Sequence, residues 1–422
     1  MLLRSAAFLV MMSAQDVSAP NLLDQTFDEG HGDLSVTQGH KPSAEMQACL
    51  SAPTRECAIA ASLDTVIKEE MGLERAKVLS ALTEAFIDMK DMEQARGILD
   101  MALEEARSVG ISIALQISLK DIAPLYARVG EADMAFDLAL EMQFEVTRDA
   151  VFKEMALLFA AKGDFNAMQR ALDGITNKDK SFWFQVDALK KTDQPIPLDL
   201  LTSITAIVGA FDRYDLQYRG KSALAVLKTK SNDAQGATVL WDELDANFVK
   251  ISSNSVKAQF AAVKVADMAL ANLDDKLIDE QLGFAQALAS RIKSNGELQM
   301  LAGYLGPVEM MRGYEKTAVD RAISFDDVSE RLKYYIKLAK VKHTQSLPLI
   351  KAINKDLIKI LAVDGAYERD GLRYHALRAA YQMKDVALIK RIVEAIEDDD
   401  NQARGVALLS AILPVSAIQP TK

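Results

Sequence analysis

The chain has 422 residues, of which half are hydrophobic, about a quarter are charged and only ten are proline. This composition excludes a disordered, collagen-like or disulfide-scaffold protein and supplies enough apolar side chains for a large core. The formal charge of −11 argues against a general nucleic-acid binder, because a phosphate backbone requires a basic footprint. The length predicts two or three compact domains or one elongated repeat array.

The first nineteen residues have the features of a secretory signal peptide. Arg4 precedes a short apolar run at residues 5–14, and Ala19 offers a small residue at a cleavage point. A run of this length is too short to span a bilayer, so no transmembrane span is expected. We expect an exported protein, periplasmic or otherwise extracytoplasmic. The alternative is an ordinary N-terminal helix in a cytoplasmic protein.

The only two cysteines, Cys49 and Cys57, flank a turn signal made by Pro53 and Thr54. Cysteines on either side of such a turn can form a disulfide in an oxidising compartment. The alternative is two small buried side chains, which free cysteines resemble. Two cysteines without nearby histidines supply too few ligands for a metal ion, so no metal site is expected.

The folded part of the chain is expected to begin near residue 44. Residues 20–43 are polar, contain three glycines and show no period, which predicts a flexible leader. Beyond them helix-forming residues dominate, and apolar residues recur at spacings of three and four. No run of alternating β-branched residues is present, so the expected fold class is all-α.

Three segments share a pattern of an apolar helix, a polar break and a second apolar helix. At each break a glycine or polar residue ends one helix and an acidic residue begins the next. The breaks are Lys90-Asp91, Gly130-Glu131 and Gly163-Asp164. Large and small residues recur at corresponding places in the three units: Leu79, Leu82, Thr83, Phe86, Ala95, Leu99 and Ala102; Leu119, Ile122, Ala123, Tyr126, Ala135, Ala139 and Met142; Phe152, Met155, Ala156, Phe159, Met168, Leu172 and Ile175.

These units resemble the tetratricopeptide repeat over about residues 73–175. They are degenerate, because their spacing is uneven and the usual closing proline is replaced by Arg107, Thr147 and Lys180. The resemblance implies an α-solenoid of stacked antiparallel helical hairpins, in one or two blocks.

The expected organisation is a series of helical repeats with one interruption. Repeats are expected over 44–175, an interrupting loop over 176–198, further helical repeats over 199–415 and a tail over 416–422. The loop is inferred from an aromatic triplet at 182–184 followed by Pro195 and Pro197. A later break is expected near Gly306-Pro307.

The resemblance also implies a binding surface. In tetratricopeptide proteins the first helix of each unit lines a concave groove, and the matching positions are Lys77, Glu84, Lys120, Arg128 and Lys153. An extended concave surface suits the binding of another protein. Its cationic bias predicts an acidic peptide segment as the partner.

A second cationic surface is predicted between Glu330 and Lys359. Its basic residues are Arg331, Lys333, Lys337, Lys340, Lys351, Lys355 and Lys359. Either they form two solvated helix faces, or they form a docking patch for an acidic partner or an anionic membrane surface.

The sequence contains no recognisable catalytic apparatus. The four histidines show no zinc-binding spacing, and no serine stands in a Gly-x-Ser-x-Gly turn. Gly220-Lys221-Ser222 resembles the end of a phosphate-binding loop, but Asp215 occupies the place of the required upstream glycine. We therefore expect a non-catalytic, cofactor-free scaffold or adaptor. The alternative is a ligand-binding sensor or enzyme accessory subunit with its site near residues 176–198.

Overall fold

The computed structural model describes residues 43–69, 71–110, 112–342 and 345–414. The described residues form 21 α-helices and one 3-10 turn and contain no strand, which confirms the all-α expectation. The predicted signal peptide (1–19), nearly all of the predicted leader (20–43) and the tail (416–422) lie outside the described residues.

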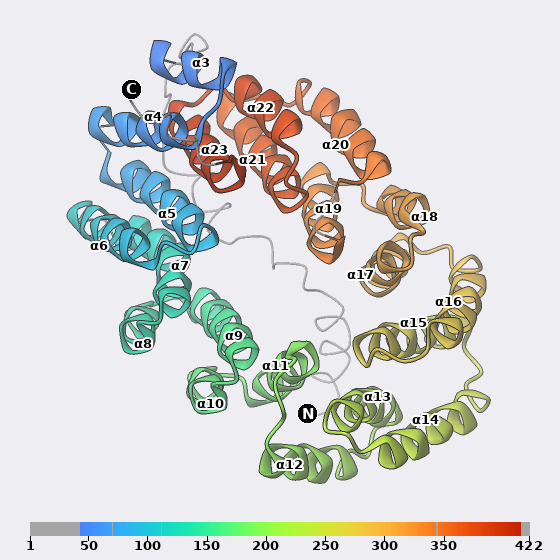
Figure 1. The fold of residues 1–422 in the computed structure, drawn as a ribbon. Coiled ribbons are helices and arrows are strands. Elements are labelled where there is room, and N and C mark those ends of the chain that lie inside the picture. The colour runs from blue at the N-terminus through green and yellow to red at the C-terminus, as the bar shows by residue number, and fades with distance from the viewer. Residues whose placement is uncertain (1–42, 70, 111, 343–344, 415–422) are drawn as a thin grey trace, which may run out of the picture.

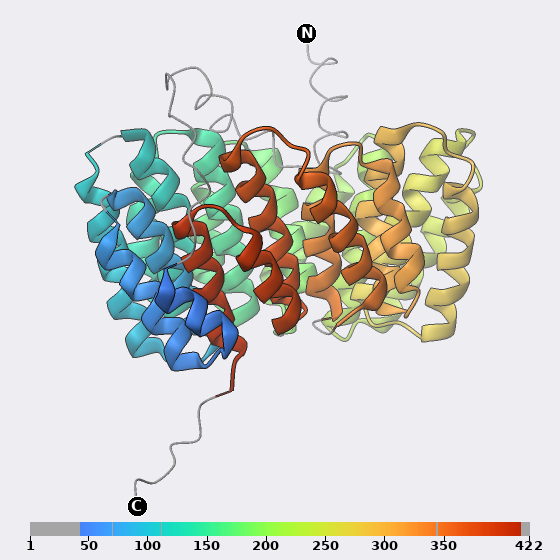
Figure 2. The same cartoon turned by 90° about the horizontal axis from the view of Figure 1, so that it is seen from above.

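The helices form an inner and an outer layer that together close into a ring (Figure 1). The inner layer contains α5 (Gly72–Asp88), α7 (Ser112–Val129), α9 (Glu145–Lys162), α11 (Lys178–Lys191), α13 (Tyr214–Lys230), α15 (Asn254–Leu270), α17 (Asn295–Met311), α19 (Val328–Lys342), α21 (Ala366–Gln382) and α23 (Asp399–Ile412). The outer layer contains α4 (Arg55–Lys68), α6 (Met92–Ser108), α8 (Ala132–Leu140), α10 (Phe165–Asp173), α12 (Leu198–Gly209), α14 (Ala234–Phe248), α16 (Asp275–Ala289), α18 (Glu315–Asp320), α20 (Leu347–Ile360) and α22 (Val386–Ala395). The short helix α3 (Ala44–Ser51) packs on α4, and the 3-10 turn η1 (Arg321–Ser324) follows α18. Seen from above, the helices stand side by side along the wall of the ring, as expected for a solenoid-like stack (Figure 2).

The ring closes because helices from the two ends of the chain pack on each other. The last helix, α23, packs on both α4 and α5. The guanidinium Nη2 of Arg55 donates to the carbonyl oxygen of Leu413 at 2.7 Å, and the Ser62 hydroxyl donates to the carbonyl oxygen of Ala403 at 3.1 Å. The N-terminal helix α4 therefore acts as the outer-layer partner of the C-terminal helix α23.

The predicted repeat positions form the core between the hairpins. All of the large and small residues named above in the three units are buried. They lie on the hairpins α5–α6, α7–α8 and α9–α10, whose two helices pack on each other, except Met142 and Ile175, which follow α8 and α10. Small residues such as Ala95, Ala135 and Ala156 allow the helix backbones to approach, and large neighbours fill the space between them.

The predicted breaks are the turns within these hairpins. Lys90, Gly130 and Gly163 adopt positive φ angles of 64°, 96° and 78°. The following residue donates its backbone N–H to a carbonyl five residues earlier, as in the bond from Asp164 to Phe159 at 2.9 Å. This is the hydrogen bond of a Schellman motif, which satisfies a carbonyl at the end of the first helix. The side chain of Asp164 then caps the next helix by accepting from the N–H of Ala167 at 2.9 Å.

The expectation of an interrupting loop at 176–198 is wrong over most of its length, because α11 occupies Lys178–Lys191. Asn177 caps this helix by accepting from the N–H of Lys180, and Trp183, Val186 and Leu189 are buried at helical spacing. Pro195 and Pro197 follow the helix and lie in the connection to α12. The expected break at Gly306-Pro307 is also wrong, because α17 continues through Pro307.

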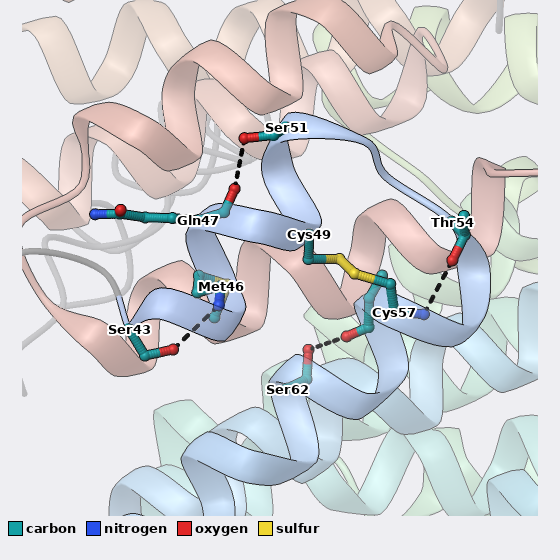
Figure 3. Close-up of a disulfide and its surroundings, with 9 residues drawn as sticks. Ser43, Met46, Gln47, Cys49, Ser51, Thr54, Cys57 and Ser62 are labelled. Atoms are coloured by element: carbon teal, nitrogen blue, oxygen red, sulfur yellow. Dashed lines mark hydrogen bonds between the residues drawn. A yellow bond between two sulfur atoms is a disulfide. The ribbon is translucent and has the colours of Figure 1, made fainter.

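The structure joins Cys49 of α3 to Cys57 of α4 by a disulfide, with the two Cα atoms 5.6 Å apart (Figure 3). The turn between the helices is the one signalled by Pro53 and Thr54. Thr54 caps α4 by accepting from the N–H of Cys57 at 3.2 Å. The disulfide therefore holds α3 against α4, which itself forms part of the ring closure.

A substitution at Gly405 tests the tight packing of α23 in the closed ring. A Cβ at this position would lie 2.5 Å from Cγ2 of Val393 and 2.6 Å from Cδ1 of Leu377. We expect Gly405→Ala to lower the free energy of unfolding by about 1–3 kcal/mol, because α23 would have to move away from α21 and α22. In the control Gly371→Ala, where the added Cβ meets nothing within 4 Å, helix propensity should raise stability by about 0.5–1 kcal/mol. Equal stability of the two variants in urea titrations would contradict the packing.

The closure also contains a buried carboxyl group whose charge opposes folding. Asp400 on α23 is 5 % exposed, and burial together with the charges of Asp398, Glu69 and Glu74 raises its pKa to about 8. An unfolded aspartate has a pKa of about 3.9, so between these values the folded protein binds the extra proton. Stability contributed by this protonated carboxyl is therefore present at low pH and is lost as pH rises towards 8.

Asp400→Asn replaces the carboxyl with a neutral group of the same shape. We expect the variant to be more stable than the wild type at pH 8, by on the order of 1–3 kcal/mol, and to differ little below about pH 4. Thermal unfolding across this pH range measures the difference. The control is Asp137→Asn at an exposed position of α8, which should leave the pH profile unchanged. If the stability of Asp400→Asn and that of the wild type change in parallel with pH, the Asp400 carboxyl does not set the pH dependence of stability.

Candidate functional site

The inner layer carries the residues predicted to line a concave surface. Lys77 and Glu84 lie on α5, Lys120 and Arg128 on α7, and Lys153 on α9. These three inner helices form one side of the ring interior (Figure 1). The interior contains two groups of paired charges, with a set of unpaired charges between them.

The first group, the Glu84 cluster, links α5 and α7 to α21 across the closure. The guanidinium of Arg378 donates two hydrogen bonds to the Glu84 carboxylate, at 2.6 and 2.9 Å. Arg128 lies 3.9 Å from the same carboxylate and donates to Asp88 at 2.7 Å. Asp88 also accepts a hydrogen bond from the Tyr381 hydroxyl. Burial acts to raise the pKa of Glu84, but the charges of Arg378, Arg128 and Lys340 outweigh it and lower the pKa.

The second group, the Lys190 cluster, links α11, α13 and α15. The ammonium of Lys190 lies 2.7 Å from one carboxylate oxygen of Asp267, and the Ser222 hydroxyl donates to the other oxygen at 2.7 Å. Asp187 lies 3.8 Å from the same ammonium. Burial acts to lower the pKa of Lys190, but the charges of Asp267 and Asp187 outweigh it and raise the pKa. Lys190 is therefore held in its charged form.

Aromatic residues extend the Lys190 cluster. The guanidinium of Arg219 lies 4.3 Å from the ring centroid of Trp183, which stacks on Phe211 with centroids 5.9 Å apart. Tyr304 on α17 lies near enough for the charges of Arg219 and Lys190 to act on its hydroxyl, whose pKa is raised by burial. The aromatic residues at 182–184 are thus part of helix packing and border the interior.

Unpaired charges lie between the two clusters. Glu154 on α9 and Lys340 on α19 are exposed to solvent. Burial nevertheless raises the pKa of Glu154 and lowers the pKa of Lys340, and each charge acts on the other. In the described part of the chain, neither side chain forms an ion pair or hydrogen bond. Both side chains are therefore exposed groups on inner-layer helices, near enough for each charge to act on the other.

The structure does not show the cationic bias that was expected for the concave surface. Lys77 pairs with Glu74 at 2.8 Å, Arg128 pairs with Asp88, and the ammonium of Lys153 lies 4.7 Å from the ring centroid of Phe184. Asp121 and Glu154, each directly after a predicted lysine, are exposed on the same inner helices and lie near enough for the Asp121 charge to act on Glu154. The surface is therefore of mixed charge and has no simple cationic bias.

Sequence reasoning missed Asp121 and Glu154. A signal for them was present, because Asp121 stands two residues after Leu119 and Glu154 stands two residues after Phe152, at equivalent places in successive units. Arg378 and Asp267 had no such signal, since their partners are distant in the sequence. Only the closed arrangement of the helices brings them to Glu84 and Lys190.

The predicted basic patch between 330 and 359 is not one surface. Arg331 is 8 % exposed and pairs through two hydrogen bonds, at 3.0 and 3.1 Å, with the buried Asp356, so its assignment to a surface patch is wrong. Lys333 and Lys359 pair with Glu330 and Asp356, each at 3.0 Å. The remaining lysines are exposed, with Lys337 and Lys340 on the inner helix α19 and Lys351 and Lys355 on the outer helix α20. The two stripes therefore belong to different layers of the wall.

Comparisons of the chain with protein-family models, curated proteins and solved structures find no match. Within the residues that the structure describes, no helix is long and apolar enough to cross a membrane. The same residues contain no group of three or more metal-ligating side chains arranged to hold an ion.

A substitution at Arg378 tests the Glu84 cluster. Arg378→Met removes both hydrogen bonds to Glu84 and leaves that carboxylate with the more distant Arg128. We expect the free energy of unfolding to fall by about 2 kcal/mol and the pKa of Glu84 to rise, because burial is no longer outweighed. Urea titration and carbon NMR of the carboxyl group measure the two effects. The matched control is Lys316→Met, which breaks an ion pair whose side chains are 82 % and 56 % exposed and should cost less than about 0.5 kcal/mol.

Proposed function

We propose that the protein is a non-catalytic helical-repeat scaffold or adaptor that binds a polypeptide segment of another protein at the inner surface of its ring. The observation that carries this proposal is the inner layer of the ring, whose helices α9 and α19 present the exposed charges Glu154 and Lys340 without an ion pair or hydrogen bond in the described residues. Charged groups held this way lower their free energy when a ligand supplies partners, which is why such groups concentrate at binding sites. The tetratricopeptide-like pattern of the first three hairpins supports the same role.

We further propose that the protein works outside the cytoplasm. The disulfide between Cys49 and Cys57 supports this location, because disulfides persist in oxidising compartments and are rare in the cytosol. The features of a secretory signal in residues 1–19 support it independently.

A second candidate function is a ligand sensor or enzyme accessory subunit. It is favoured by the Lys190 cluster, where Lys190, Arg219 and Tyr304 meet near the stacked rings of Trp183 and Phe211. A cation, a hydroxyl and an aromatic surface could together hold a small anionic or aromatic molecule. Native mass spectrometry of the purified protein distinguishes the two functions. A bound small molecule lost in Tyr304→Phe would favour the sensor.

A photo-crosslinking residue placed inside or outside the ring tests the scaffold proposal. We expect the residue at Lys120, on the inner helix α7, to give an adduct with one defined segment of a partner in extracts of the source cells. The residue at Met101, which is 47 % exposed on the outer helix α6, should not give that adduct. The same adduct from both positions, or from the outer position alone, would show that binding does not use the interior.

A further inference from the structure

An open cleft of about 620 Å³ lies at the beginning of the outer helix α22. Its walls come from parts of the chain that are distant in the sequence. Pro53 lies in the turn between α3 and α4, Gln345 precedes α20, and the other lining residues fall within 384–394. Figure 1 shows α3, α20 and α22 in the same part of the ring. The cleft is therefore separate from the inner surface that is proposed to bind a polypeptide.

Three cationic side chains line this cleft. Lys390 and Arg391 lie on α22, and Lys384 lies in the turn before it. Lys384 and Arg391 are exposed, and Lys390 is half-buried. In the part of the chain that the structure describes, none of the three side chains forms an ion pair or hydrogen bond. Cations that gather in one cleft attract an anion into it.

Two carboxylates also line the cleft, and one of them is already engaged. Asp385 is buried and caps α22 by accepting from the N–H of Leu388 at 2.9 Å. Glu394 is exposed and lies one turn beyond the cations of α22. The cleft thus holds three cations against two carboxylates, and the Glu394 carboxylate opposes a bound anion.

The backbone at the start of α22 adds hydrogen-bond donors. Val386 and Ala387 are the first two residues of the helix, and both line the cleft. The N–H groups in the first turn of a helix have no carbonyl partner within the helix, and the helix dipole is positive there. Backbone donors and cationic side chains together are the groups that recognise phosphate in proteins.

The cleft is much larger than a phosphate group. Its volume lies in the range of small-molecule sites. Pro53 supplies an apolar wall, which the disulfide between Cys49 and Cys57 ties in place, and Gln345 supplies an amide. A ligand with an organic part beyond its phosphate would contact both.

We propose that this cleft binds a small phosphorylated organic molecule, whose phosphate is held by the three cationic side chains and whose organic part lies against Pro53 and Gln345. A phosphate carries more negative charge than a single carboxylate, so it gains more from the three cations and tolerates Glu394 better.

Calorimetric titration of the full chain tests the proposal. The probes are adenosine monophosphate, ribose phosphate and inorganic phosphate, with adenosine and ribose as their neutral counterparts. We expect saturable binding of at least one organic phosphate with a Kd of about 1 mM or lower, at least about threefold tighter than inorganic phosphate. The neutral counterparts should not bind.

Substitutions with matched controls locate the site. Lys384→Gln and Arg391→Gln remove exposed charges from the cleft and should each weaken phosphate binding about three- to fivefold. Lys90→Gln changes an exposed lysine at the equivalent turn before α6, where φ is 64° against 55° at Lys384. Arg291→Gln changes an exposed arginine after α16. Both controls should leave binding unchanged, and circular dichroism confirms that each variant is folded.

Glu394→Gln should change binding in the opposite direction. We expect it to strengthen phosphate binding about twofold, because it removes a carboxylate from the cleft.

Several outcomes would overturn the proposal. The site is wrong if no phosphate binds saturably, or if Lys90→Gln weakens binding as much as Lys384→Gln. The organic part is wrong if inorganic phosphate binds as tightly as both organic phosphates. A tetraglutamate peptide that binds more tightly than either organic phosphate, and loses its affinity in Arg391→Gln, would show that the cleft docks an acidic protein segment instead. None of these outcomes bears on binding at the inner surface.

Discussion

The contact of α23 with α4 and α5 is the constraint on which the ring depends. Elsewhere around the wall each inner helix packs on inner helices near it in the sequence, whereas this contact joins residues such as Arg55 and Leu413. Without it, the apolar faces of the first and last helices would remain open, as at the ends of any solenoid, where terminal repeats need a polar face. Here each end covers the other. The disulfide between Cys49 and Cys57 reinforces the N-terminal half of this contact by holding α3 on α4.

Closure also explains why so many charges inside the ring are paired. Bringing α21 beside α5 places Arg378 and Glu84 where little water remains, and an unpaired charge there would be costly. Two direct hydrogen bonds join the Arg378 guanidinium to the Glu84 carboxylate. Lys190 and Asp267 likewise pair their buried charges between α11 and α15. Against this background, Glu154 and Lys340 differ from the paired groups, because neither side chain forms an ion pair or hydrogen bond in the described residues.

Local packing could be predicted from the sequence, but long-range closure could not. Positions such as Leu82 and Phe86 follow from helical spacing, and the Gly163-Asp164 turn follows from glycine and capping preferences. The error at 176–198 came from giving Pro195 and the aromatic triplet more weight than the helical spacing of Trp183, Val186 and Leu189. The tetratricopeptide resemblance did not extend to the later repeats because charged residues replace the aromatic residue before the turn. Lys228 and Glu309 stand there, and each is neutralised, by Asp233 at 2.5 Å and by Arg321 at 2.6 Å.

A closed wall limits how a partner reaches the interior. A segment can enter an open solenoid groove from the side, since the groove has no wall opposite it. In this ring, neighbouring helices pack on one another around the wall, so the interior opens at the two rims. The buried carboxyl of Asp400 lies at the contact of α23 with α4 and α5, beside Asp398 and Glu69. The contact that closes the ring therefore carries a buried carboxyl group, and the stability of the closure falls as pH rises towards 8.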